Sequence, residues 1–212
     1  MRVLTLNVQS FRAGVDRIAE VIRATDPDVV ALQEAYRRPS RALARSTGLG
    51  LIFGARRPLR RFGNALLARD PMRDPLRVRF TKTAALARRA AVVAVLPSGI
   101  AVASLHLGLS QTERERHAAE LLRALGRYER VVLCGDINES PGGAAYRLLA
   151  ARFTDVFASA GEGTGETFPA AALRERIDYV FCSRDLTPVR AAVVPIVASD
   201  HLAVVAEIAE IA

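Results

Sequence analysis

Polar side chains stand at the ends of several apolar segments in this sequence. The segment Val131–Gly142, VVLCGDINESPG, leads from apolar residues straight to Asp136 and Asn138. Glu34 ends a second apolar segment, PDVVALQE, and His106 stands at the end of a third, GIAVASLHL. A charged side chain without a partner is costly to bury in apolar surroundings. These residues are therefore candidates for chemistry rather than for packing.

The same pattern recurs at three other places. Asn7 ends the first apolar segment, Asp178 lies within RIDYVF, and Asp200 and His201 come just before the last apolar segment. A helix cap or a satisfied turn explains one such residue, but not the whole series. If the strand ends converge, the series forms one acidic pocket that contains histidines. Carboxylate and amide oxygens suit Mg²⁺, with Mn²⁺ as a substitute, so a divalent cation is the predicted cofactor.

The two histidines add proton transfer to this predicted pocket. An imidazole gives or takes a proton near neutral pH. A metal and histidines offset the charge that grows on phosphate oxygens, while a carboxylate or a His–Asp pair deprotonates the attacking water. The residue types therefore predict hydrolysis of a phosphate ester. A simple hydrogen bond at a strand end is the alternative for His106, and His117, in mid-helix without a motif, is interpreted as structural.

Short apolar or alternating segments predict the elements that position these residues. Strands are expected at residues 2–8, 27–34, 51–56, 63–69, 90–97, 99–107, 129–136, 176–183, 188–195 and 201–208. Helices are expected at residues 16–24, 110–126 and 144–150. Two helix-covered sheets packed face to face explain this order better than a helix bundle or a parallel doubly wound sheet. The predicted fold class is α/β.

Three local details sharpen this prediction. Residues 97–99, Pro-Ser-Gly, predict a hairpin between the strands on either side. Ser110 and Glu113 fit a capping box at the start of the longest helix, and Gly126 suits its end. The glycine-rich stretch 161–165 lacks the setting of a phosphate-binding loop and is interpreted as a flexible connector.

Length and composition bound the class of protein. The chain has 212 residues, half of them hydrophobic, which predicts one domain over residues 1–212. No apolar run approaches the roughly 20 residues that span a bilayer, and the first strand begins at Arg2, so a cytoplasmic monomer without a leader is expected. Cys134 and Cys182 lie in apolar segments and are predicted to be buried free thiols.

Positive charge is concentrated in one part of the chain. Residues 35–90 hold fifteen Arg and Lys against two Asp, a net charge of +13, while the whole chain carries +8. Such a block predicts a polyanionic partner such as nucleic acid. Only Lys82 is a lysine, so a general arginine bias that leaves a merely solvated surface is the alternative.

The segments TLNV, LQE, GNALLAR, SLHLG, GDIN, RIDYVF and SDH, in this order, resemble the endonuclease/exonuclease/phosphatase superfamily. That superfamily includes DNase I, abasic-site endonucleases of the exonuclease III type, neutral sphingomyelinases and inositol polyphosphate 5-phosphatases. The resemblance runs from Asn7 to His201 and implies a four-layer α/β sandwich. Each motif alone is weak, but seven in series are specific.

The resemblance implies a role for each polar residue. The metal would be held by Glu34, with Asn7 and Asp200 beside it. The catalytic set would be His106, Asp136, Asn138, Asp178 and His201: Asp136 for the attacking water, Asn138 for a phosphate oxygen, His201 for the scissile phosphate, Asp178 to orient His201, and His106 for phosphate binding or acid–base chemistry. Asn64, Arg88 and Arg89 are candidate contacts to the substrate phosphate, although Asn64 equally suits a turn.

The sequence also takes sides within the superfamily. Abasic-site endonucleases usually have tyrosine at the position of His106 and asparagine at that of Leu109, so a dedicated repair enzyme is less favoured. The expected function is a Mg²⁺-dependent phosphodiesterase that acts on DNA or RNA. A small-molecule or lipid phosphoesterase is the alternative, and a catalytically silent binding module is less favoured because the site residues are all present.

Overall fold

Two β-sheets form the centre of the molecule in the computed structural model, which describes residues 1–54, 62–81 and 89–210. The first sheet has seven strands in the order β10-β12-β13-β1-β2-β4-β3, and the second has six in the order β5-β6-β7-β8-β11-β9. Both sheets mix parallel and antiparallel neighbours. The predicted α/β sandwich of two sheets is therefore confirmed.

The strands of the first sheet are β1 (Arg2–Asn7), β2 (Val29–Tyr36), β3 (Gly50–Gly54), β4 (Phe62–Ala68), β10 (Gly161–Glu162), β12 (Leu186–Val194) and β13 (Ala203–Glu210). Those of the second are β5 (Arg73–Arg79), β6 (Ala90–Val95), β7 (Ala101–His106), β8 (Val131–Asp136), β9 (Thr154–Asp155) and β11 (Asp178–Cys182). The helices are η1 (Gln9–Phe11), α1 (Val15–Thr25), α2 (Arg37–Thr47), α3 (Gln111–Leu125), α4 (Ala144–Ala150) and α5 (Val156–Ala160).

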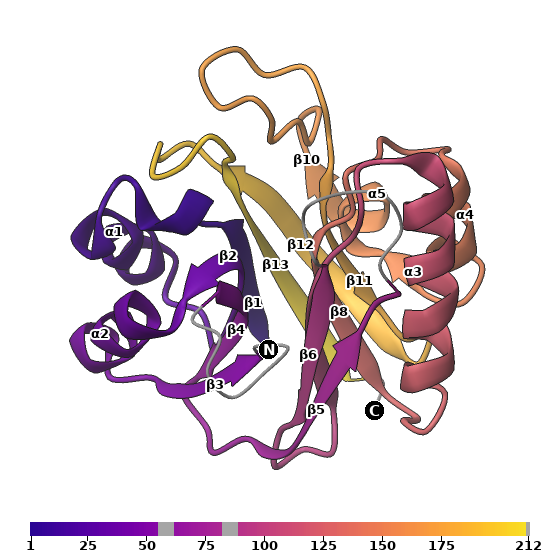
Figure 1. Cartoon of the computed structure of the whole chain (residues 1–212), viewed down its shortest axis with the longest axis horizontal. Helices are drawn as coiled ribbons and strands as arrows, with labels where there is room; N and C mark the ends of the chain where they lie inside the picture. The colour runs from indigo at the N-terminus through magenta and orange to yellow at the C-terminus, as the bar shows by residue number, and fades with distance from the viewer. Residues whose placement is uncertain (55–61, 82–88, 211–212) are drawn as a thin grey trace.

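Helices cover the outer side of each sheet. In Figure 1, α1 and α2 lie against the first sheet, and α3 and α4 lie against the second. Alternation along β1 explains the layering: Leu4 and Leu6 pack with the helices, whereas Val3 belongs to the core between the sheets. Successive side chains of a strand point to opposite faces. Burial on both faces of each sheet thus gives the four layers that the resemblance implied.

Several predicted details are confirmed. Ser110 caps α3 by accepting a hydrogen bond from the amide of Glu113, 3.3 Å away. β6 and β7 form an antiparallel pair, and Gly99 closes their turn by donating its amide to Leu96 over 2.9 Å. α4 spans the predicted residues. Cys134 and Cys182 are buried free thiols.

Other parts of the fold differ from the sequence prediction. Helix α2 and strand β5 were not expected, and both are rich in arginine. The stretch 161–165, interpreted as a connector, begins with β10, which pairs in parallel with β12 through Gly161 and Glu162. A two-residue strand carries too little pattern to be predicted, so its partner across the sheet determines it. No helix in the described ranges is long and apolar enough to cross a membrane.

Candidate active site

Three candidate residues stand side by side in the second sheet. β7 and β8 are parallel, with His106 opposite Asp136, and β11 runs antiparallel to β8, with Asp178 opposite Asp136. Neighbouring strands lie about 4.8 Å apart, so this register brings the three side chains into one row. All three are buried. The row lies at the carboxyl ends of β7 and β8.

The backbone around Asp136 is shaped by two unusual residues. Gly135 has a φ of +148°, and a Cβ there would lie 2.1 Å from the carbonyl oxygen of Leu105, so only glycine fits. Asn138 takes a left-handed φ of 53°, which asparagine tolerates better than most residues. The Oδ1 atom of Asp136 accepts the amide of Asn138 at 2.9 Å, and the Asn138 side chain donates to the carbonyl of Leu107 at 3.0 Å. This turn fixes the Asp136 carboxylate.

The second oxygen of Asp136 is the meeting point of the site. Asn7 at the end of β1 donates its amide nitrogen to Oδ2 over 3.1 Å, and the Nε2 atom of His106 lies 3.2 Å from it. The Nε2 atom of His201 lies 3.9 Å from the same oxygen. Residues from both sheets therefore converge on one carboxylate.

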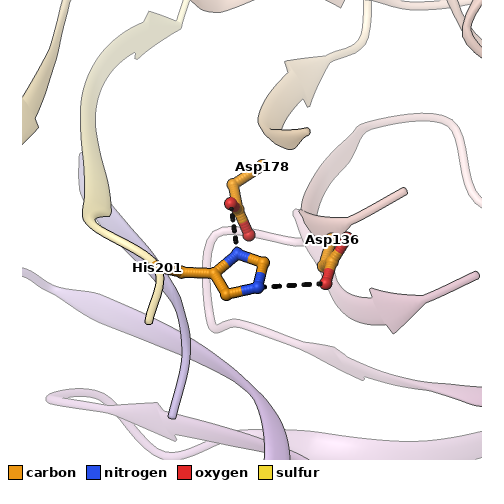
Figure 2. A group of neighbouring side chains, drawn as sticks. All are labelled: Asp136, Asp178 and His201. Atoms are coloured by element: carbon orange, nitrogen blue, oxygen red, sulfur yellow. Dashed lines mark hydrogen bonds and ion pairs between the residues drawn. The ribbon is translucent and has the colours of Figure 1, made fainter. Parts of the chain in front are cut away.

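His201 and Asp178 form a buried pair, drawn in Figure 2 with the imidazole between the carboxylates of Asp178 and Asp136. The Nδ1 atom of His201 lies 2.8 Å from Oδ2 of Asp178, and that oxygen also accepts the hydroxyl of Thr167 at 2.6 Å. The ring of Phe168 covers His201, with centroids 4.7 Å apart. Because Nδ1 faces a carboxylate, it carries a proton, and Nε2 points toward Asp136.

Burial and neighbouring charges shift the pKa values of these groups in opposite directions. Burial alone would lower the pKa of His201, but Asp178, Asp136 and Asp200 raise it to about 9. Burial would raise the pKa of Asp136, but His106, His201 and Asn7 lower it, and the net shift is downward. Burial raises the pKa of Asp178 despite its contacts with His201 and Thr167. At neutral pH the site therefore holds an imidazolium beside an ionised Asp136.

Glu34 is positioned by an irregularity in β2. The pairing of β2 with β4 shifts between Leu32 and Ala35, so β2 carries one extra residue there. Glu34 has a left-handed φ of 52° at this bulge. Bulges re-aim side chains and occur often next to active sites, and a strained non-glycine residue costs about 1–3 kcal/mol. The strain is consistent with a carboxylate held for a purpose other than packing.

Arg89 links Glu34 to the histidine row. Its Nη1 atom lies 3.6 Å from a carboxylate oxygen of Glu34 and 2.9 Å from Nδ1 of His106. A guanidinium can only donate, so Nδ1 of His106 accepts and the ring proton lies on Nε2, facing Asp136. Both nitrogens of His106 are thereby occupied.

Asp200 joins the site through Gln9. The amide nitrogen of the Gln9 side chain donates to Oδ2 of Asp200 at 2.8 Å, and its backbone amide donates to Oδ1 of Asn7 at 3.1 Å. Ser199 donates its hydroxyl to the other oxygen of Asp200. Gln9 to Phe11 form a short turn whose three residues have φ values of 41°, 59° and 62°. This left-handed turn orients the end of β1 toward Asp200.

One network of contacts thus connects nine of the eleven predicted site residues: Asn7, Glu34, Arg89, His106, Asp136, Asn138, Asp178, Asp200 and His201. Asn64 lies apart, because its amide nitrogen donates to the carbonyls of Ala90 and Ser104 and so ties the two sheets together. That arrangement favours the structural interpretation of Asn64. Arg88 lies outside the described residues.

Two further residues of the network were not singled out from the sequence. Gln9 follows a strand, where glutamine is ordinary, and Thr167 acts only through Asp178. The one signal was position: Gln9 stands two residues after Asn7, and Thr167 begins the segment TFP. His117, by contrast, is structural as interpreted, since its Nε2 lies 3.0 Å from the carbonyl of Thr81 and its ring stacks on Phe80.

The donor types fit a hard divalent cation. Glu34, Asn7 and Asp200 offer only oxygen ligands from side chains, and Glu34 is 27% exposed, open enough to receive an ion. Asp136, Asp178 and His201 also bring ligand atoms within 4.8 Å of one another. Those atoms already face hydrogen-bonding partners inside the protein, apart from Oδ1 of Asp178, which is buried without one among the described residues. Because Glu34 is partly exposed whereas Asp136, Asp178 and His201 are all buried, the set that contains Glu34 is the better candidate metal site.

Comparisons with known proteins identify the family and agree with the fold. The model of the Endonuclease/Exonuclease/phosphatase family matches residues 4–201. Among solved structures, a mannosyl-6-phosphatase from Bacteroides thetaiotaomicron has a TM-score of 0.85 at 17% identity, with 98% of this chain and 99% of that chain covered. The human nocturnin catalytic domain with bound sulfate has a TM-score of 0.79 at 21% identity, covering 100% and 94%. Humanized D. rerio TDP2 has a TM-score of 0.79 at 18% identity, covering 98% of each. No curated protein is matched by sequence.

Proposed function

The chain belongs to the endonuclease/exonuclease/phosphatase family, whose members are hydrolases of phosphoester bonds, and from that premise we propose that it is a Mg²⁺-dependent phosphodiesterase acting on DNA or RNA. The observation that carries the reaction type is the convergence of Asn7, His106 and His201 on one oxygen of Asp136. Strand ends from both sheets meet there, and each contributes a group that phosphoester hydrolysis needs.

The metal would be held by Glu34, Asn7 and Asp200. Once bound, Mg²⁺ supplies positive charge that offsets the charge growing on the phosphate oxygens. Mn²⁺, which favours the same oxygen ligands, is the expected substitute.

The protein's own groups do the rest of the chemistry. Asp136, whose pKa is lowered, stays ionised and orients the attacking water. His201 carries a proton at neutral pH because its pKa is raised to about 9, and its Nε2–H donates to a phosphate oxygen of the transition state. Asp178 holds the ring by its Nδ1–H, and Thr167 holds Asp178. Asn138 lies beside Asp136 for a second phosphate oxygen.

An exposed arginine face supports a nucleic acid as the substrate. Arg38, Arg41 and Arg45 are exposed on α2, which begins three residues after Glu34. None of the three forms an ion pair with a described residue. Unpaired guanidinium groups on a helix that follows Glu34 so closely in the chain suit a polyanion whose backbone continues past the reacting phosphate.

The test compares substrates and surfaces. We expect the protein with Mg²⁺ to nick supercoiled plasmid or cleave single-stranded RNA, and to turn over bis-p-nitrophenyl phosphate slowly. The double variant Arg38→Ala/Arg41→Ala should lower kcat/KM on the nucleic acid about tenfold and leave bis-p-nitrophenyl phosphate unchanged, with a salt dependence that weakens accordingly. Arg73→Ala/Arg79→Ala, two exposed arginines on β5, is the matched control.

A small-molecule phosphatase is the second candidate, and the structural likeness to the mannosyl-6-phosphatase favours it. Intact plasmid and intact RNA, together with turnover of p-nitrophenyl phosphate, would replace the nuclease proposal with this one. In that case the double variant on α2 would leave every activity unchanged.

A further inference from the structure

Arg89 contacts Glu34, the carboxylate that the proposed function assigns to a metal. Its guanidinium lies between the carboxylate of Glu34 at 3.6 Å and Nδ1 of His106 at 2.9 Å. The Arg89 side chain is only 10% exposed, whereas that of Glu34 is 27% exposed. A largely buried positive charge thus contacts a partly exposed carboxylate of the site.

We propose that Arg89 is a placeholder cation, which neutralises Glu34 in the metal-free protein and must yield that carboxylate when the divalent ion binds. This inference rests on the proposed function, in which Glu34 is the main metal ligand. Two cations cannot share one carboxylate without repulsion, and partial burial strengthens both the attraction to Glu34 and the repulsion from the ion. Arg89 therefore weakens metal binding in the absence of substrate.

A displaced guanidinium has a second use in this site. The Nε atom of Arg89 is buried and has no hydrogen-bonding partner among the described residues. An N–H group in that state is costly and favours any acceptor that arrives. An anionic phosphate is such an acceptor, and its charge suits a guanidinium better than a histidine nitrogen does.

Metal and substrate are then linked through one side chain. A bound metal releases Arg89 from Glu34 and frees it for the phosphate, and a bound phosphate draws Arg89 away and frees Glu34 for the metal. Such coupling is reciprocal by thermodynamic necessity. Arginine suits this exchange because it stays charged at any working pH.

The experiment measures Mn²⁺ binding directly, by calorimetric titration without substrate. Arg89→Met should tighten Mn²⁺ binding about tenfold, equivalent to about 1.4 kcal/mol. Arg89→Lys, which keeps the charge, should bind Mn²⁺ within about twofold of the unaltered protein. Arg77→Met is the matched control, since Arg77 is exposed and, among the described residues, its side chain hydrogen-bonds to the carbonyl of Phe53 alone.

A second titration tests the linkage, with dimethyl phosphate as the anionic probe. In the unaltered protein a saturating amount of dimethyl phosphate should tighten Mn²⁺ binding several-fold, and in Arg89→Met this effect should vanish. Unchanged Mn²⁺ affinity in Arg89→Met, with the phosphate effect intact, would overturn the placeholder role.

Glu34→Gln separates the two levels of inference. If Mn²⁺ binding is lost in Glu34→Gln but unaffected by Arg89→Met, the metal site stands and only the placeholder fails. If Glu34→Gln binds Mn²⁺ as tightly as the unaltered protein, the proposed metal site itself is wrong. Circular dichroism of each variant checks that the fold is retained.

Discussion

The two ends of the sandwich carry similar residue types in opposite settings. At the carboxyl ends of β1, β2, β7 and β8, the side chains of Asp178 and His201 pair with only 0% and 6% of their surface exposed. At the other end, Arg69 pairs with Asp26, and these side chains are 54% and 76% exposed. Both ends show close ion pairs, but only one is shielded from water.

The comparison indicates that burial, rather than ion pairing alone, distinguishes the candidate site. An exposed pair is screened by solvent and contributes about 0–1 kcal/mol, so each partner behaves nearly independently. Buried groups polarise one another, and the raised pKa of His201 beside the lowered pKa of Asp136 is the result. Strongly perturbed groups of this kind cluster at functional sites.

One cavity lined by described residues contains none of the candidate site residues. A cavity of about 290 Å³ opens at the end opposite the candidate site, with Asp28, Asp70 and Glu210 among its lining residues. Glu210 is engaged by Arg130, and Asp28 accepts the backbone amide of Arg2. Contacts with Arg130 and Arg2 account for Glu210 and Asp28, whereas the buried row at the other end requires a chemical explanation.

Among variants of the two ion pairs compared above, the largest effect is expected from His201→Ala. Loss of a proton donor to the phosphate should lower kcat on bis-p-nitrophenyl phosphate about 10³-fold. Arg69→Ala, at the other end, is the matched control and should keep full activity. Equal rates in the two variants would remove the distinction between the ends.

Asp178→Asn should have the next largest effect. It keeps the shape of the side chain but removes the charge that stabilises the His201 imidazolium, so we expect kcat to fall about 10²-fold with KM nearly unchanged. Thr167→Val removes the hydroxyl that donates to Asp178. Its kcat should lie between that of Asp178→Asn and that of the unaltered protein. If Asp178→Asn kept a kcat above roughly 50% of normal, orientation of His201 by Asp178 would not matter for catalysis.

The pH dependence of the metal-free protein sharpens the comparison further. Contacts with carboxylates raise the pKa of His201 from the ordinary value to about 9. The charge of its imidazolium therefore contributes stability fully below about pH 6.5, the ordinary histidine pKa. That contribution is lost as pH rises through the folded value. NMR of the imidazole protons should give a midpoint near 9, and Asp178→Asn should move the midpoint down; a midpoint at the ordinary value in the unaltered protein would contradict the electrostatic description.

The smallest effect is expected at the exposed end. Arg69→Ala breaks the pair with Asp26 but should change the free energy of unfolding in urea by less than about 1 kcal/mol. Added salt should shrink the difference further, because exposed charges are screened. A loss of several kcal/mol would mean that exposure does not separate the two ends.

The sequence predicted which polar residues lie together better than it predicted the scaffold around them. Residues such as Asp136 and His106 stood out because they interrupt apolar strands. Helix α2 did not, since its buried side is short and consists of Ser40, Leu43 and Ala44, and β5 alternates arginine with few apolar residues. Both elements are determined by tertiary contacts that a local pattern lacks.

Contacts between distant residues set a second limit. Gln9 donates a hydrogen bond to Asp200, 191 positions away in the sequence. Arg89 contacts Glu34 and His106, which lie on two different strands. Residue type and spacing identified the members, but not which atom faces which. Asn64 is an example. The sequence suited both a phosphate contact and a backbone contact, and two carbonyls in the opposite sheet, which accept its hydrogen bonds, favour the backbone contact.

The central claim is that the strand-end cluster is a metal-dependent phosphoesterase site. The most direct test is the initial rate of bis-p-nitrophenyl phosphate hydrolysis as Mg²⁺ is titrated into chelator-treated protein, for the unaltered chain and for Glu34→Gln. We predict a saturable, metal-dependent rate in the unaltered protein and none in Glu34→Gln. Hydrolysis that persists without metal, or an equal rate in Glu34→Gln, would contradict the claim.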